Sequence, residues 1–187
     1  MKKIFLFATL LGVALTSCVK DELSQEAKQQ SKIVFDTPVV SPSTKVAEIP
    51  VGYDNNLSFG VWAKYYQNGN YVDNGFASAP LYMNNVKVKK DATEGWITYG
   101  GSPEVVTPYY WPKNGTLTFI AYSPYEANAT FDHTGITFTD YTVDGDVSKQ
   151  KDLLYSERTY NYNNGIVPIA FKHALSSIRF TVKAGGT

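Results

Sequence analysis

Among the residues of this chain, Cys18 has the sequence context that most clearly indicates a chemical role. It is the only cysteine among 187 residues, so its thiol cannot form an internal disulfide. It follows a basic start (MKK), an apolar run over residues 4–15 that is too short to span a bilayer, and the small residues Thr16 and Ser17. The single thiol of the chain therefore stands directly behind a leader-like segment.

The segment Leu15-Thr16-Ser17-Cys18 resembles the lipobox of bacterial lipoprotein signal peptides. The resemblance implies that residues 1–17 are a lipoprotein signal peptide, that a signal peptidase cuts between Ser17 and Cys18, and that the cysteine is acylated. The alternative is an ordinary secretory leader followed by an incidental cysteine. Residues 18–31 are polar, have no apolar face and predict a lipidated flexible tether.

The charged residues at the start of this tether allow two interpretations. Lys20-Asp21-Glu22 is similar to the surface-export signal of Bacteroidales lipoproteins, which would place the protein on the outside of the outer membrane. The alternative is a solvated charged tether without an export role, because short charge runs are common on protein surfaces.

Catalytic and metal-binding patterns are absent from the sequence. The two histidines, His133 and His173, lie far apart, and no HExxH motif or Cys/His cluster occurs. The formal net charge is zero, so no basic stripe indicates nucleic acid as a partner. We therefore predict a protein that is not an enzyme and that needs no cofactor or metal. For His173, between Phe171 and Leu175, we expect a buried imidazole that bonds to backbone carbonyls.

The elements that carry these residues are predicted to be almost entirely β-strands. Short segments in which apolar and polar residues alternate recur every 8–15 residues, with turn signals between the segments. In the segment at residues 176–183, we expect Ile178, Phe180 and Val182 to face the core. The predicted fold is all-β, an antiparallel β-sandwich of transthyretin-like, Greek-key type. The expected strands are residues 57–66, 81–90, 94–101, 115–123, 134–143 and 176–183.

The segment between the tether and these strands divides into two parts. Residues 32–37 (KIVFDT) predict a short first strand, rich in β-branched and aromatic residues. Residues 38–56 contain three prolines and little periodicity, and predict a long exposed loop. The backbone of such a loop can enter a protease cleft without unfolding a core.

Three motifs between residues 60 and 183 resemble the fimbrillin family, the subunits of type V pili in Bacteroidales. The first is residues 109–125, YYWPKNGTLTFIAYSPY, an aromatic-Trp-Pro turn followed by a strand. The second is GVWAKYY at 60–66, and the third is KDLLYSE at 151–157 followed by VPIAFKHALSSIRFTVK at 167–183. The resemblance assigns residues 57–187 to the N-terminal domain of the family, and the family's C-terminal domain has no counterpart in this sequence.

The resemblance implies a structural subunit of a cell-surface pilus that is exported as a lipoprotein and supports adhesion. A protease would remove the first strand, and a strand of another pilin subunit would then fill the open groove. The family's usual cleavage site is similar to Thr-Arg followed by a small or apolar residue, which Thr44-Lys45-Val46 matches apart from the lysine. A cut between Lys45 and Val46 suits a trypsin-like or Arg/Lys-specific protease. The alternative is a plain loop that no maturation protease cuts.

A surface glycan-binding lipoprotein is the competing function. Aromatic side chains stack on sugar rings when they are exposed on one face, whereas a pilin would bury most of them. Exposure of Trp62 and Trp96 distinguishes the two functions. The residues expected in such a platform are Trp62, Tyr65, Tyr66, Trp96, Tyr109 and Tyr110.

Overall fold

The computed structural model describes residues 31–41, 51–67, 78–125, 128–132 and 135–175. Regular structure in these ranges is β-strand, apart from one short 3-10 turn, η2 (Val147–Lys149). The predicted all-β class is thereby confirmed. In the same ranges no helix is long and apolar enough to cross a membrane.

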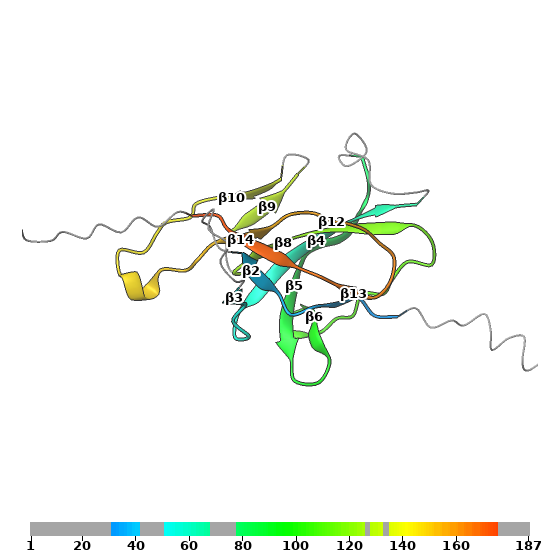
Figure 1. Ribbon diagram of the computed structural model, residues 1–187, viewed down its shortest axis with the longest axis horizontal. Coiled ribbons are helices and arrows are strands. Elements are labelled where there is room, and N and C mark those ends of the chain that lie inside the picture. Colours follow the sequence, from blue (N-terminus) through cyan, green and yellow to red (C-terminus); the bar gives the residue numbers. More distant parts are fainter. Residues whose placement is uncertain (1–30, 42–50, 68–77, 126–127, 133–134, 176–187) are drawn as a thin grey trace, which may run out of the picture.

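The strands join into one twelve-stranded sheet and a separate two-stranded hairpin (Figure 1). The main path of the large sheet is β13-β1-β6-β5-β4-β8-β11-β14-β2-β3, with β12 added beside β8 and β7 beside β6. The hairpin consists of β9 (Ala129–Phe131) and β10 (Ile136–Phe138). The strands of the sheet are β1 (Val34–Phe35), β2 (Val39–Ser41), β3 (Val51–Gly52), β4 (Ser58–Tyr66), β5 (Leu81–Asp91), β6 (Gly95–Gly100), β7 (Val105–Val106), β8 (Thr116–Ser123), β11 (Leu154–Ser156), β12 (Thr159–Tyr162), β13 (Ile166–Val167) and β14 (Ala170–His173).

The long antiparallel strands β5, β4 and β8 form the centre of the sheet. β8 directs Leu117, Phe119 and Ala121 into the main core, as its alternation predicts. The opposite face of β8 is buried as well, because Ile120 and Tyr122 pack with β4 residues beneath the β9–β10 hairpin. A strand that is covered on both sides reads as a continuous apolar run, and TLTFIAYS has that character.

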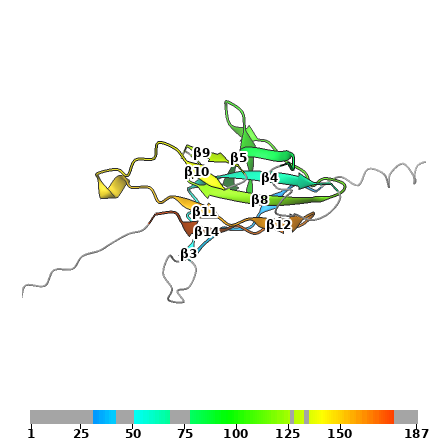
Figure 2. The same ribbon diagram turned by 90° about the horizontal axis from the view of Figure 1, so that it is seen from above.

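The sheet curls, so that strands distant in its order face each other. Phe59 on β4 and Phe171 on β14 are separated in the sheet by β8 and β11, yet their ring centroids are 5.7 Å apart. In Figure 2, β4 and β8 lie above β12 and β14, and the main core fills the space between them. The expected arrangement as two packed sheets with Greek-key connections stays a prediction, because all the described strands except the β9–β10 hairpin belong to one curled hydrogen-bonded sheet.

Two sequence-based expectations need correction. Residues 38–56 are not one long loop, because residues 39–41 and 51–52 pair as β2 and β3. His173 does not bond to backbone carbonyls; its side chain is 30% exposed and its Nδ1 lies 2.6 Å from Oδ2 of Asp152. The strand expected at residues 176–183 lies outside the described residues.

Candidate functional site

The candidate site is the groove that holds the first strand, by which we mean residues 31–41. This strand is hydrogen-bonded along both edges, although it stands at the beginning of the described chain. On one edge the amide of Ile33 donates to the carbonyl of Tyr109 at 2.8 Å, and the amide of Trp111 donates to the carbonyl of Ser31 at 3.0 Å. Farther along, Phe35 pairs with Trp96 of β6.

The other edge of the first strand runs parallel to residues 166–172. Val34 and Phe35 pair with Ile166 and Val167 of β13, and the three residues of β2 pair with Ala170, Phe171 and Lys172 of β14. Antiparallel pairing with β3 completes the second half of the first edge. The first strand therefore lies between two rows of backbone partners, and its removal would leave both rows open (Figure 1).

The side chains of the first strand form part of the main core. Ile33 and Phe35 are each only 2% exposed, Pro38 is buried and Val40 is half-buried against the same cluster. The ring of Phe35 contacts Phe59 and Phe119 edge to face, with centroid distances of 5.7 Å and 5.8 Å. Burial of such a side chain stabilises a fold by about 1.5–3 kcal/mol. The groove is thus apolar on its floor and polar on its two edges.

The regular alternation of the first strand breaks at its midpoint. Three residues, Asp36, Thr37 and Pro38, separate the paired positions Phe35 and Val39, whereas two residues separate their partners Val167 and Ala170 on the opposite strand. One extra residue on one strand of a pair is a β-bulge. The amide of Asp36 still donates to the carbonyl of Val167 at 2.9 Å, and the amide of Thr37 donates to the Asp36 carboxylate at 2.7 Å.

Charged groups mark the beginning of the groove. The Lys32 ammonium lies 2.8 Å from the Glu94 carboxylate, and this hydrogen bond raises the lysine pKa. Glu94 belongs to a turn that is fixed by Asp91, whose carboxylate accepts hydrogen bonds from the amides of Glu94 and Thr93 and from the Thr93 hydroxyl. These hydrogen bonds lower the Asp91 pKa to about 2, and the bond from the Glu94 amide has the largest effect. An exposed ion pair of this kind contributes little stability and mainly favours one register.

The residues predicted to undergo cleavage and lipidation do not belong to the part of the chain that the structure describes. Ser17, Cys18, Lys45 and Val46 all lie outside the described residues. What the structure adds is the position of the strand that precedes Lys45. Among the described residues, no group of three or more His, Cys, Asp and Glu side chains is placed to hold a metal ion.

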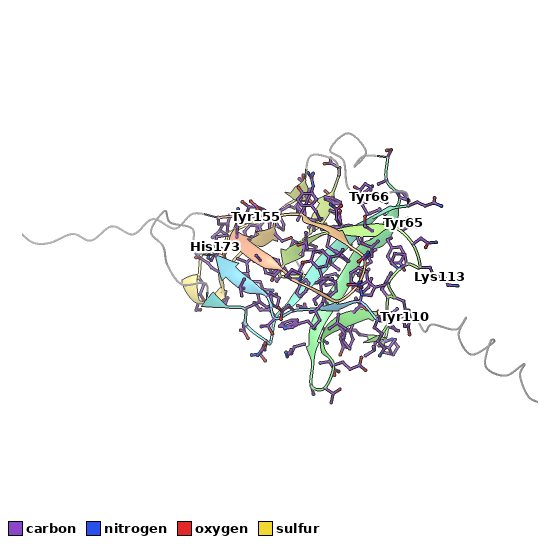
Figure 3. All side chains as sticks on the ribbon, turned by 45° about the vertical axis from the view of Figure 1, so that its right-hand side comes forward. Tyr65, Tyr66, Tyr110, Lys113, Tyr155 and His173 are labelled. Carbon is purple, nitrogen blue, oxygen red and sulfur yellow. The ribbon has the colours of Figure 1, made fainter. Side chains whose placement is uncertain are left out.

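The predicted glycan platform is wrong for its two tryptophans. Trp62 is 3% exposed and stacks against Tyr122 and Phe131, while Trp96 is 1% exposed inside the main core. Of the tyrosines, Tyr65, Tyr66 and Tyr109 are half-buried and Tyr110 is 36% exposed. Figure 3 shows Tyr65, Tyr66 and Tyr110 at one end of the molecule and His173 at the other. The six residues therefore do not present the exposed stacking face that sugar binding requires.

Tyr53 is a core residue of the groove that sequence reasoning missed. It is 5% exposed, and its ring lies 5.3 Å from that of Phe171 and 5.4 Å from that of Trp96. Its hydroxyl donates to the carbonyl of Ser58 at 3.2 Å and shares a 2.6 Å hydrogen bond with the Ser123 hydroxyl. The sequence signal was weak, because a single aromatic residue between Gly52 and Asp54 has no alternating neighbours.

A protein-family model described as fimbrillin-like matches residues 44–187. The matched range holds most residues that line the groove but not the first strand that fills it. Searches among curated proteins and among solved structures found no match.

Proposed function

This chain belongs to the fimbrillin-like family, and from that premise we propose that it is a structural subunit of a cell-surface pilus that polymerises by exchange of its first strand. In this proposal a strand of a neighbouring subunit replaces residues 31–41 in the groove. The observation that carries the proposal is the double-edged pairing of the first strand over an apolar floor. A groove with two open backbone edges and vacant side-chain pockets is the kind of surface that captures an added strand.

Proteolysis is the proposed trigger. The first strand is joined to β3 only through residues 42–50, which contain Lys45 and Val46. A cut between these two residues by a trypsin-like or Arg/Lys-specific protease would break the covalent link between the first strand and β3 without cutting any described strand. The buried Ile33 and Phe35 favour retention of the cut strand, so exchange requires a competing strand that fills the same pockets.

Lipidation at Cys18 is the proposed route to the surface. An acylated Cys18 would hold the precursor on the outer membrane, and residues 19–30 would span the distance to the first strand. Since the first strand follows the tether directly, a cut at Lys45 would also release the subunit from its lipid once the strand has left the groove. Adhesion is then a property of the assembled pilus.

Limited trypsin digestion with N-terminal sequencing tests this function. We expect a new N-terminus at Val46 and higher-mass species when a full-length subunit of the family is added to the cut protein. The matched control is Lys45→Gln, which removes the cleavage site and leaves the first strand unchanged. A Lys45–Val46 bond that resists trypsin in the folded protein, or a cut protein that never exchanges its strand, would contradict the proposal.

A further inference from the structure

The inward side chains of the first strand are unevenly spaced. Ile33, Phe35 and Val40 of the first strand lie in or against the main core, and Pro38 is buried between the last two of these. The steps between them are two, three and two residues, whereas an unbroken strand would repeat every two residues. Asp36 and Thr37, which lie between the two halves, are both exposed.

The strand opposite the first strand keeps the regular two-residue repeat. Val167, Ile169 and Phe171 are buried, and Pro168 and Ala170 between them are exposed. The extra residue therefore belongs to the first strand alone. Phe35 pairs with Val167, and Val40 pairs with Phe171. Any strand that reaches from the Phe35 position to the Val40 position must therefore contain one residue more than the opposite strand has between Val167 and Phe171.

Residues 38–40 of the first strand are also paired along the other edge, with residues 51–53. The amide of Tyr53 donates to the carbonyl of Pro38 at 3.2 Å, and Val39 and Val40 pair with Gly52 and Val51. A one-residue slip in a strand turns every following side chain to the opposite face. A strictly alternating strand that places its aromatic residue in the Phe35 position would therefore turn its later apolar residues toward solvent.

We propose that the groove accepts an incoming pilin strand whose inward side chains follow the pattern i, i+2, i+5, i+7, with an aromatic residue at i+2. This inference rests on the proposed strand exchange and specifies its partner. The i+2 position corresponds to Phe35, which fills the space between Phe59 and Phe119 edge to face. A smaller residue there would leave a cavity among rigid aromatic neighbours.

Peptides that copy residues 31–41 test the spacing directly. The full chain, with a site-specific protease sequence in place of Lys45–Val46, is cut and then mixed with labelled peptide, and binding is followed by fluorescence anisotropy. Deletion of Thr37 keeps all four apolar residues but changes the spacing to two, two and two. We expect this peptide to bind at least roughly tenfold more weakly than the natural one, and Phe35→Ala to bind roughly a hundredfold more weakly.

Two control peptides separate spacing from composition. Thr37→Ala changes the same exposed residue without changing the spacing, and it should bind within about twofold of the natural peptide. A peptide of residues 176–187 carries Ile178 and Phe180 at the spacing of Ile33 and Phe35, but it has lysine and glycine at the positions of Pro38 and Val40. It should bind weakly. Equal binding of the natural and Thr37-deleted peptides would overturn the inference.

The uncut chain provides a test that does not depend on exchange. Deletion of Thr37 in the full protein should lower the Tm by at least about 5 °C relative to Thr37→Ala. Equal Tm values for the two variants would overturn the spacing rule even if strand exchange occurs. Failure of every peptide to enter the cut protein, together with the expected loss of Tm, would instead contradict strand exchange and leave the spacing rule supported.

Discussion

Phe35 is the residue on which the attachment of the first strand depends most. Its ring contacts Phe59 and Phe119 edge to face, and almost none of it reaches solvent. Phe35→Ala should lower the free energy of unfolding by about 3–5 kcal/mol, since a cavity remains where the ring stood. Urea denaturation followed by tryptophan fluorescence measures this loss.

The control for Phe35 is its neighbour Val34, which is half-buried and directed to the other face of the strand. Val34→Ala should cost about 1 kcal/mol or less. Equal losses in the two variants would mean that the first strand is held by its backbone pairing alone, and the groove would then have no side-chain pocket for a partner.

Asp91 shows how one carboxylate fixes the turn beside the groove. Its folded pKa of about 2 lies below the ordinary value of 3.8, because backbone and hydroxyl donors favour the ionised form. A group with a lowered folded pKa stabilises the fold above its ordinary pKa, and this contribution disappears as the pH falls through the folded pKa. The turn should therefore keep its order at pH 5 and lose it progressively below about pH 4.

An NMR titration of the Asp91 carboxyl carbon checks this expectation, with a predicted midpoint near 2. Thr93→Val removes the hydroxyl donor but keeps the Thr93 and Glu94 amides, and it should move the midpoint part of the way back toward 3.8. A midpoint at the ordinary value in the unmodified protein would show that the hydrogen bonds of this turn do not persist in solution.

At the scale of single elements, β4 contains a glycine whose lack of a side chain permits close packing. A Cβ at Gly60 would lie 2.1 Å from Cε1 of Tyr122 and 2.8 Å from Oδ1 of Asn85. Tyr122 is held there by donating to Asn85 Oδ1 at 2.9 Å and by stacking near Trp62. The glycine of the GVWA motif thus allows a tyrosine of β8 to cross the face of β4.

Gly60→Ala should destabilise the protein by about 1–3 kcal/mol, because Tyr122 must move out of a packed cluster. Gly52→Ala in β3 is the matched control, since no atom lies within 4 Å of the added Cβ; it should change stability by about 0.5 kcal/mol or less. Thermal denaturation compares the two. Equal stability of both variants would show that the cluster of Trp62, Ile120, Tyr122 and Ala129 relaxes freely around the added methyl group.

The sequence predicted long alternating elements better than short or composite ones. β4, β5, β6 and β8 were expected within a few residues, because each is a run of six or more residues that is rich in β-branched and aromatic side chains. β2 and β3 were missed, since prolines flank the Val39–Val40 pair and each element has only two or three residues. The bulge at Asp36–Pro38 has no signal of its own, because it exists only relative to the strand opposite.

The candidate site could be predicted only in outline. The first strand was expected to fill a groove, and its residues Ile33 and Phe35 are buried in one. The edges of that groove come from segments near residues 96, 110, 167 and 171, and no local pattern indicates that these segments meet. The two platform tryptophans were misplaced for a similar reason, since exposure depends on how the sheet curls rather than on residue type.

At the scale of the whole molecule, the proposed lipid anchor makes a separate prediction. Cys18→Ala should abolish incorporation of labelled palmitate and move the protein from the membrane fraction to the soluble fraction, because a multiply acylated cysteine anchors stably and an unmodified leader does not. Palmitate label that persists in Cys18→Ala would contradict the anchor.

The parallel pairing of the first strand has a consequence for the order in which the chain folds. Residues 31–41 leave the ribosome early, but β13 and β14 come near the end of the described chain. Closure of so long a loop is entropically costly and slow, so the first strand takes its place after the antiparallel centre has collapsed. A newly made molecule therefore passes through a short-lived form with an unfilled groove. If the groove exchanges strands as proposed, folding and polymerisation would compete kinetically for the unfilled groove, and premature contact between nascent subunits would join them before export.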